Sequence, residues 1–123
     1  FDIQETENGQ LFAVGLRGNI FLADNDSDDW NRLQTCVTTS LNSIVHGKNN
    51  NIYITGNNGV LLSLDQTSVG VNQYYPANDE GCAMHISIKK LKNDLSDSIL
   101  NGLVINDAIL AVTASGIKQI ELK

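Results

Sequence analysis

The chain has 123 residues, of which 41% are hydrophobic, and carries 14 acidic against 8 basic residues for a formal net charge of −6. This acidic balance disfavours binding to nucleic acids or anionic membranes, and no apolar run in the sequence is long enough for membrane insertion. With one proline and almost no helical periodicity, the composition favours an all-β chain.

The clearest signal in the sequence is an internal repeat built on a glycine turn. Residues 11–24 read LFAVGLRGNIFLAD and residues 52–65 read IYITGNNGVLLSLD. Two glycines and an aspartate recur 41 residues apart, and the matched pairs are Gly15 with Gly56, Gly18 with Gly59, and Asp24 with Asp65. Residues 109–122, ILAVTASGIKQIEL, form a third copy in which Gly116 matches Gly59 and Thr113 replaces the first glycine. We predict that these glycines and aspartates are structural turn residues.

Each copy predicts the same succession of short strands. In the second copy we expect strands near 41–45, 52–55 and 60–64, followed by a more variable fourth strand. Four short strands in about forty residues are typical of a propeller blade. We therefore predict an all-β fragment of a β-propeller, with about three blades of short antiparallel strands. The units are residues 1–40, residues 41–99 with an insertion near 66–84, and residues 100–123, which make an incomplete blade.

The insertion is indicated by a change in spacing. Asp24 and Leu41 are 17 residues apart, whereas the corresponding Asp65 and Leu100 are 35 apart. We expect residues 66–84 to form a surface loop, with the fourth strand following at 85–91 and its counterpart in the first unit near 30–37. Functional loops of repeat proteins tend to be such insertions, so Tyr74 and Tyr75 are the predicted binding residues.

The two ends of the sequence suggest a piece of a larger assembly. The chain opens on Phe1 within an expected first strand and ends at Lys123, directly after an expected third strand. Such an arrangement is expected of a C-terminal fragment or a processed piece, and it would leave strand edges and blade faces uncovered. We therefore expect association with a protein partner, with further copies of the chain, or with the missing blades of a longer chain.

The repeat resembles two related groups of propeller repeats. An aliphatic strand, VG-x-x-G or TG-x-x-G, and a second aliphatic strand ending in S-x-D are similar to the photosystem II stability/assembly-factor-like repeat and to the bacterial neuraminidase (Asp-box) repeat. Ser63 and Asp65 match the opening of the S-x-D-x-G-x-T-W box, where Thr67 replaces the glycine. In the first unit Asp24 and Trp30 match the box. The resemblance covers most of the chain and implies a propeller, in a family that includes glycosidases, assembly chaperones and adhesive modules.

The acidic stretch at residues 24–29, DNDSDD, is a candidate calcium loop. Alternate carboxylates at Asp24, Asp26 and Asp28 could supply oxygen ligands. The sixth position of the loop is Asp29 where glycine is required, and the twelfth is Thr35 where glutamate is required. We therefore favour a structural turn and predict neither a metal nor another cofactor.

Cys36 and Cys82 are the two cysteines, and His46 and His85 the two histidines. An even pair of cysteines permits one disulfide, which would suit an exported protein. The sequence does not fix the compartment, and an exported location (periplasmic, lumenal or secreted) is slightly favoured. No motif links these four residues, so buried or unpaired cysteines are favoured over a Cys–His catalytic site.

The sequence predicts no catalytic residue. Sialidase chemistry, which the Asp-box resemblance suggests, resembles a site with an arginine triad, a tyrosine nucleophile and an acid/base aspartate, but the arginines here are Arg17 and Arg32 alone. We expect the basic cluster Lys89, Lys90 and Lys92 to lie on an edge strand and to keep that edge from pairing with another chain. We predict a non-catalytic propeller module that serves as a protein-interaction or assembly scaffold. The alternatives are a glycan-binding or sialidase-related module and a structural piece of a larger secreted or surface protein.

Overall fold

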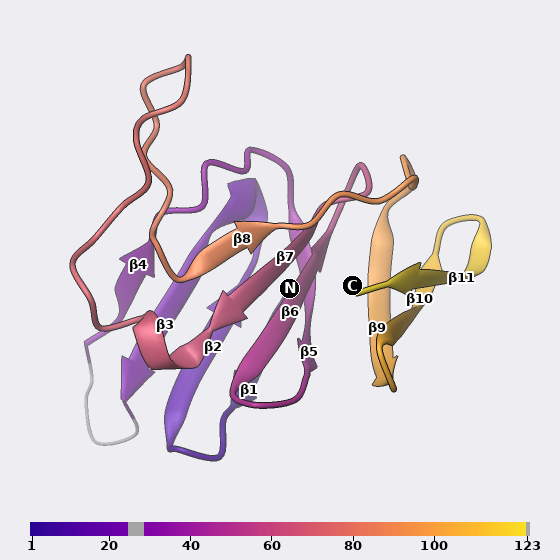
Figure 1. The fold of residues 1–123 in the computed structure, drawn as a ribbon, viewed down its shortest axis with the longest axis horizontal. Coiled ribbons are helices and arrows are strands. Elements are labelled where there is room, and N and C mark those ends of the chain that lie inside the picture. Colours follow the sequence, from indigo (N-terminus) through magenta and orange to yellow (C-terminus); the bar gives the residue numbers. More distant parts are fainter. Residues whose placement is uncertain (25–28, 123) are drawn as a thin grey trace.

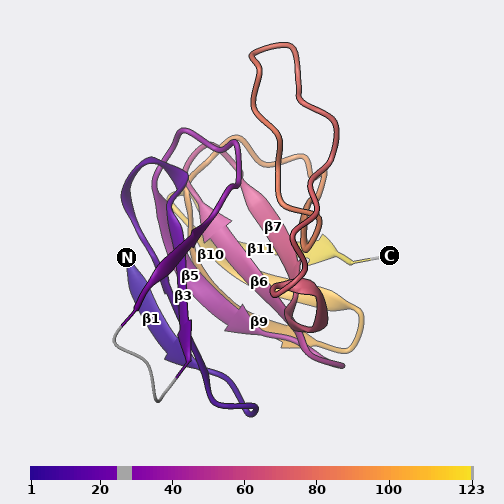
Figure 2. The same cartoon turned by 90° about the vertical axis from the view of Figure 1, so that its left-hand side faces the viewer.

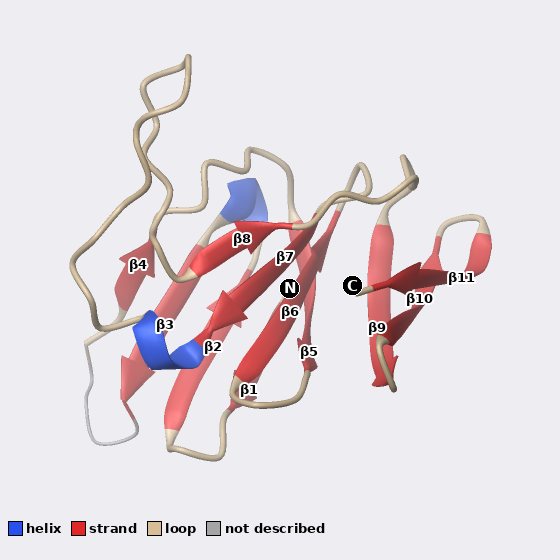
Figure 3. Ribbon diagram, in the orientation of Figure 1, coloured by secondary structure: helices blue, strands red, loops and turns tan. Residues whose placement is uncertain are grey.

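The computed structural model describes residues 1–24 and 29–122, which form three small antiparallel β-sheets (Figure 1). The prediction of an all-β chain with three blades of short antiparallel strands is confirmed. Helical structure in the described residues is limited to two single 3-10 turns, η1 (Leu16–Gly18) and η2 (Gln66–Ser68) (Figure 3). None of the described helical turns is long and apolar enough to cross a membrane.

Each sheet is a meander in which the strands pair in sequence order. Blade 1 contains β1 (Asp2–Glu5), β2 (Gln10–Val14), β3 (Ile20–Asp24) and β4 (Asn31–Leu33). Blade 2 contains β5 (Leu41–His46), β6 (Asn51–Gly56), β7 (Leu61–Asp65) and β8 (Ile88–Lys90). Blade 3 contains β9 (Ile99–Ile105), β10 (Ala108–Thr113) and β11 (Gly116–Glu121).

The blades adjoin through their first strands, since β5 contacts both β1 and β9. The backbone N–H of Ile44 donates to the Asp2 carboxylate at 2.9 Å, which ties blade 2 to blade 1. The side-chain amide of Asn42 donates to the Ile99 carbonyl at 2.9 Å, which ties blade 2 to blade 3. Figures 1 and 2 show the three sheets following one another in this order. We call the face of a blade that looks toward the next blade its front face, and the opposite face its back face.

The larger core lies between the front face of blade 1 and the back face of blade 2. Strand β6 shows how the sequence specifies it, because its side chains alternate between the two faces of the sheet. Ile52 and Ile54 point back toward blade 1, while Tyr53 points forward. The buried side chains of this core are Phe12, Val14, Ile20 and Leu33 of blade 1, and Leu41, Ile44, Ile52, Ile54, Leu62, Leu64 and Ile88 of blade 2, together with Val60 and Val69 in the segments before and after β7. Burying a side chain of this size contributes about 1.5–3 kcal/mol.

A smaller core lies between the front face of blade 2 and the back face of blade 3. Leu61 of blade 2 packs there against Ile109 and Ala111 of blade 3, and all three are fully buried. Two polar side chains on the front of blade 2 satisfy each other, since the hydroxyls of Ser43 and Thr55 lie 2.6 Å apart. The same front-on-back packing is therefore used twice in this chain.

In the first two repeats, the second glycine touches the linker that leads to the next blade, which is residues 34–40 after blade 1 and residues 91–98 after blade 2. Gly18 and Gly59 have φ values of +71° and +72°, which side chains rarely adopt. A Cβ atom on Gly18 would lie 2.0 Å from the carbonyl oxygen of Val37, and one on Gly59 would lie 1.8 Å from that of Leu95. Both residues must be glycine because the linker backbone occupies the space that a side chain would need.

A polar side chain in each linker completes the contact. The Thr35 hydroxyl donates to the Gly18 carbonyl at 2.8 Å and accepts from the Val37 N–H at 3.0 Å. In the second repeat, the Asn93 side chain donates to the Gly59 carbonyl at 2.9 Å and accepts from the Leu95 N–H at 2.8 Å. Two different residues thus hold the same turn against the same part of the linker.

The third glycine takes a different place. Gly116 has a φ of +120° and pairs directly with Thr113 across a two-residue turn. Apart from Gly116 itself and its two chain neighbours, no described residue has an atom within 4 Å of the position that a Cβ on Gly116 would occupy. The sequence match of Gly116 with Gly59 therefore corresponds to a tighter turn without a linker contact.

The fourth strands are shorter than we expected. The segment 30–37 contains only β4, because the hydrogen bonds of Thr35 bend the chain after Leu33 into the linker. The segment 85–91 contains only β8, and His85 instead forms an isolated bridge with Tyr74.

The glycine contact predicts a strong effect for a small substitution. We expect Gly59→Ala to lower the free energy of unfolding by at least about 2 kcal/mol, because the new methyl group overlaps the Leu95 carbonyl at an unfavourable φ. Chemical denaturation measures this loss. Gly70→Ala is the matched control, since its Cβ would meet nothing within 4 Å. Equal stability of the two variants would contradict the assigned role of Gly59.

Candidate binding site on a disulfide-linked arm

The insertion between η2 and β8 forms a hairpin, which we call the arm (residues 72–86). The Ile86 N–H donates to the Gln73 carbonyl at 3.0 Å, and the Tyr75 N–H donates to the Met84 carbonyl at 2.8 Å. Tyr74 and His85 form a bridge between the two sides of the hairpin. Figures 1 and 2 show the arm extending beyond the edges of the sheets. The arm is thus an ordered projection with its own backbone pairing.

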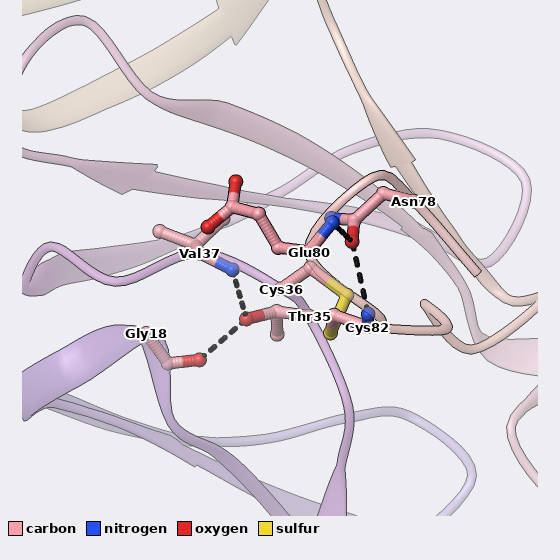
Figure 4. The surroundings of a disulfide bond; sticks show 7 residues. All are labelled: Gly18, Thr35, Cys36, Val37, Asn78, Glu80 and Cys82. Atoms are coloured by element: carbon pink, nitrogen blue, oxygen red, sulfur yellow. Dashed lines mark hydrogen bonds between the residues drawn. A yellow bond between two sulfur atoms is a disulfide. The ribbon is translucent and has the colours of Figure 1, made fainter.

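A tight turn closes the arm at residues 78–82. The Asn78 side-chain oxygen accepts from the Glu80 N–H at 3.0 Å and from the Cys82 N–H at 2.9 Å (Figure 4). The Asn78 N–H donates in turn to the Cys82 carbonyl at 2.8 Å. Gly81 adopts a φ of +82°, as such a turn requires. These bonds fix the position of Cys82.

Cys82 is joined to Cys36 by a disulfide, with the two Cα atoms 5.8 Å apart (Figure 4). The interpretation of the cysteines as unpaired is therefore wrong. Cys36 lies between Thr35 and Val37, the two linker residues that contact Gly18. The disulfide consequently links the arm to the segment that connects blades 1 and 2.

His85 fixes the base of the arm. Its backbone N–H donates to the Gln34 carbonyl at 2.9 Å, two residues before Cys36. Its buried imidazole contacts the Val71 carbonyl through Nε2 at 2.7 Å, and Nδ1 accepts from the Ser87 N–H at 3.1 Å. Since a carbonyl can only accept, Nε2 carries the hydrogen and Nδ1 offers its lone pair. His85 is thus held in place through both of its ring nitrogens.

The structure does not assemble a Cys–His catalytic site. Both sulfur atoms are in the disulfide, and the His85 ring is engaged at both nitrogens. His46 is exposed on β5, where its Nε2 lies 3.3 Å from the Gln4 side-chain oxygen.

The two tyrosines predicted to bind a partner both lie on the arm and are exposed. Tyr74 is 51% exposed and its ring meets the His85 ring edge-on, with the ring centroids 5.3 Å apart. Tyr75 is 38% exposed, and its hydroxyl donates to the Ile86 carbonyl at 3.4 Å. The arm therefore presents aromatic surface that is already positioned.

A small pocket of about 260 Å³ lies beside the disulfide. Arg17 and Arg32, the two arginines of the chain, line it together with Asn78 and Glu80 of the arm. Sequence reasoning missed this site because its walls come from blade 1, the linker and the arm. The opposite charges of Glu80 and the guanidinium groups give the pocket a mixed polar lining.

The other residues singled out in the sequence either take part in turns and strand edges or lie outside the described residues. Asp65 accepts hydrogen bonds from the N–H and hydroxyl of Thr67 at 3.0 and 2.7 Å, and from the Ser68 hydroxyl at 3.1 Å. Asp26, Asp28 and the side chain of Asp24 lie outside the described residues, so the candidate calcium loop is not described. Lys89 and Lys90 are exposed on β8, the edge strand of blade 2. Across residues 1–24 and 29–122, no group of three or more acidic, histidine or cysteine side chains is placed to hold a metal ion.

No protein-family model, curated protein or solved structure matches this chain. The resemblance to assembly-factor-like and Asp-box repeats therefore stays a prediction.

The disulfide predicts a redox-dependent stability. It closes a loop with a sequence separation of 46 residues, for which the chain-entropy account gives about 4 kcal/mol. We expect the double variant Cys36→Ser, Cys82→Ser to lose about 2–4 kcal/mol of unfolding free energy in chemical denaturation. A reductant should destabilise the native protein similarly and leave the double variant unaffected. Insensitivity of the native protein to the reductant would contradict the disulfide.

The environment of Asp65 predicts a lowered pKa. The Thr67 side chain, the Thr67 N–H and the Ser68 hydroxyl all favour the carboxylate and hold the pKa of Asp65 below its ordinary value of 3.8. The resulting stabilisation is fully present above pH 3.8 and is lost as the pH falls through the lower folded-state pKa. We expect Thr67→Val to raise this pKa toward 3.8, and Thr67→Ser to preserve it, in an NMR titration of the Asp65 carboxyl carbon. An unchanged pKa in Thr67→Val would refute this account.

Proposed function

We propose that this chain is a non-catalytic protein-interaction scaffold, in which three blades support the arm as the partner-binding element. The observation that carries the proposal is the covalent attachment of an exposed, tyrosine-bearing hairpin to the linker between blades 1 and 2. Tyrosine is enriched among residues that dominate binding energy, because it offers a large, amphipathic contact surface with few rotatable bonds.

The rigidity of the arm supports this function. Binding costs free energy for every segment that must be ordered. The arm is already ordered by its cross-strand bonds, by the Asn78 turn, and by its two attachments to the linker at Gln34 and Cys36. An element preorganised in this way loses little entropy when it binds.

The disulfide also supports an exported location. Disulfides persist in oxidising compartments such as the periplasm, the lumen of the secretory pathway or the extracellular space. We therefore propose that the scaffold works in one of these compartments.

The two tyrosines give a direct test. We would select peptides from a random peptide library on the oxidised chain, and measure their affinity for the variant Tyr74→Ala, Tyr75→Ala by biolayer interferometry. Loss of the aromatic contacts should weaken binding at least about tenfold. Leu16→Ala is the control, because Leu16 is a large apolar residue that is 60% exposed but lies in the η1 turn and not on the arm. Peptides that bind the tyrosine variant as well as the native chain would contradict the proposal.

A glycan-binding or sialidase-related module is the second candidate. The observation that favours it is the pocket lined by both arginines, since guanidinium groups recognise carboxylates such as that of a sialoside. A glycan array and a fluorogenic sialoside assay on the native chain and on Arg17→Gln, Arg32→Gln separate the candidates. Sialoside binding that is lost in the arginine variant would favour this function over the scaffold.

A further inference from the structure

The two outermost blade faces are apolar and uncovered within the described residues. On the front of blade 3, cross-strand pairing places Leu103 opposite Leu110, and Val112 opposite Ile117. Leu103 is 61% exposed and Ile117 is 66% exposed, and Ile105 and Val112 on the same face are also exposed. A hollow of about 400 Å³ continues this face at the turn between β9 and β10. A monomer rarely exposes so much contiguous apolar sheet without a partner.

The back of blade 1 is its counterpart. The pairing of Ile3 with Ala13, and of Ala13 with Phe21, places these side chains on one side of the sheet. Ile3 is 60% exposed and Phe21 is 36% exposed. The repeat aligns Ala13 with Ile54 and Phe21 with Leu62, two fully buried residues on the back of blade 2. The back of blade 1 therefore has the sequence pattern of a covered face.

The front of blade 3 likewise has the pattern of a covering face. The repeat aligns its Leu110 with Tyr53, which packs on the front of blade 2 against the back of blade 3. Within the chain, a front face meets a back face twice, in the larger and in the smaller core. One copy thus carries one unmatched front and one unmatched back of the kind that already pack together.

We propose that the front of blade 3 binds the back of blade 1 of a second copy, so that copies of this chain stack head to tail. The interface would continue the front-on-back packing of the two internal cores. The outermost strands add complementary charge, with Glu121 on the front of β11 and Arg32 on the back of β4. Because the two surfaces differ, the contact is heterologous, and association proceeds to a closed ring or to a longer stack. This inference goes beyond the proposed function, and the apolar residues that carry it lie on blades 1 and 3, outside the arm.

Light scattering on a size-exclusion column, over a range of protein concentrations, measures the association. We expect a mass that is a multiple of 13.4 kDa for the native chain. Ile3→Asp and Leu103→Asp are a matched pair, since both residues are about equally exposed and tolerate a charge in the monomer. Each should weaken association at least about a hundredfold, because an unpaired carboxylate would lose its water in the interface. Val71→Asp is the control. Val71 is an apolar residue that is 40% exposed, but it lies between η2 and the arm and not in a strand of either face, so this variant should leave the mass unchanged.

Mixing the two variants tests the head-to-tail geometry. Leu103→Asp keeps a native back on blade 1, and Ile3→Asp keeps a native front on blade 3, so an equimolar mixture should form a complex of about twice 13.4 kDa. Circular dichroism would confirm that both variants are folded, and Ile117→Asp serves as a second variant of the front face. A native chain that stays monomeric at its highest soluble concentration would overturn the proposal. So would two variants that fail to associate when mixed.

Discussion

The arrangement of this chain depends on the close approach of two glycine turns to the linkers that follow blades 1 and 2. Gly18 and Gly59 let the linker backbone pass where a side chain would stand, and Thr35 and Asn93 hold it there by hydrogen bonds. The linker then places the first strand of the next blade beside the first strand of the previous blade. Packing of a front face on a back face follows from this placement and buries the two cores.

The arm uses the same linker. Cys36 directly follows Thr35, whose hydroxyl donates to the Gly18 carbonyl. The His85 N–H donates to the carbonyl of Gln34, which directly precedes Thr35. The arm is therefore attached to the part of the chain that the glycine turn positions. Ordering such a projection alone would cost conformational entropy. Its attachments to the linker hold it in a fixed position relative to the blades. The exposed rings of Tyr74 and Tyr75 consequently occupy defined positions, as a preorganised binding element requires.

The sequence predicted the features that depend on local pattern. The 41-residue spacing of the glycines indicated the hairpins, and the near absence of helical periodicity indicated an all-β chain. It could not reveal the equivalence of Thr35 and Asn93, which are different residues and lie 17 and 34 positions after their glycines. The sequence permitted a disulfide but could not establish it, because its cysteines are 46 residues apart in two loops that only the packed fold brings together. The pocket with both arginines likewise depends on three distant segments.

Amide hydrogen exchange by NMR, in the oxidised and the reduced protein, tests most directly whether the linker and disulfide hold the arm. The account predicts slow exchange for the Tyr75 and Asn78 amides in the oxidised protein, since they donate to the Met84 and Cys82 carbonyls at 2.8 Å. Reduction should accelerate both at least about tenfold more than it accelerates the Gly59 amide, which is bonded to the Asp97 carbonyl at 2.7 Å and lies outside the arm. Arm amides that exchange freely in the oxidised protein, or equally slowly in both states, would contradict the account.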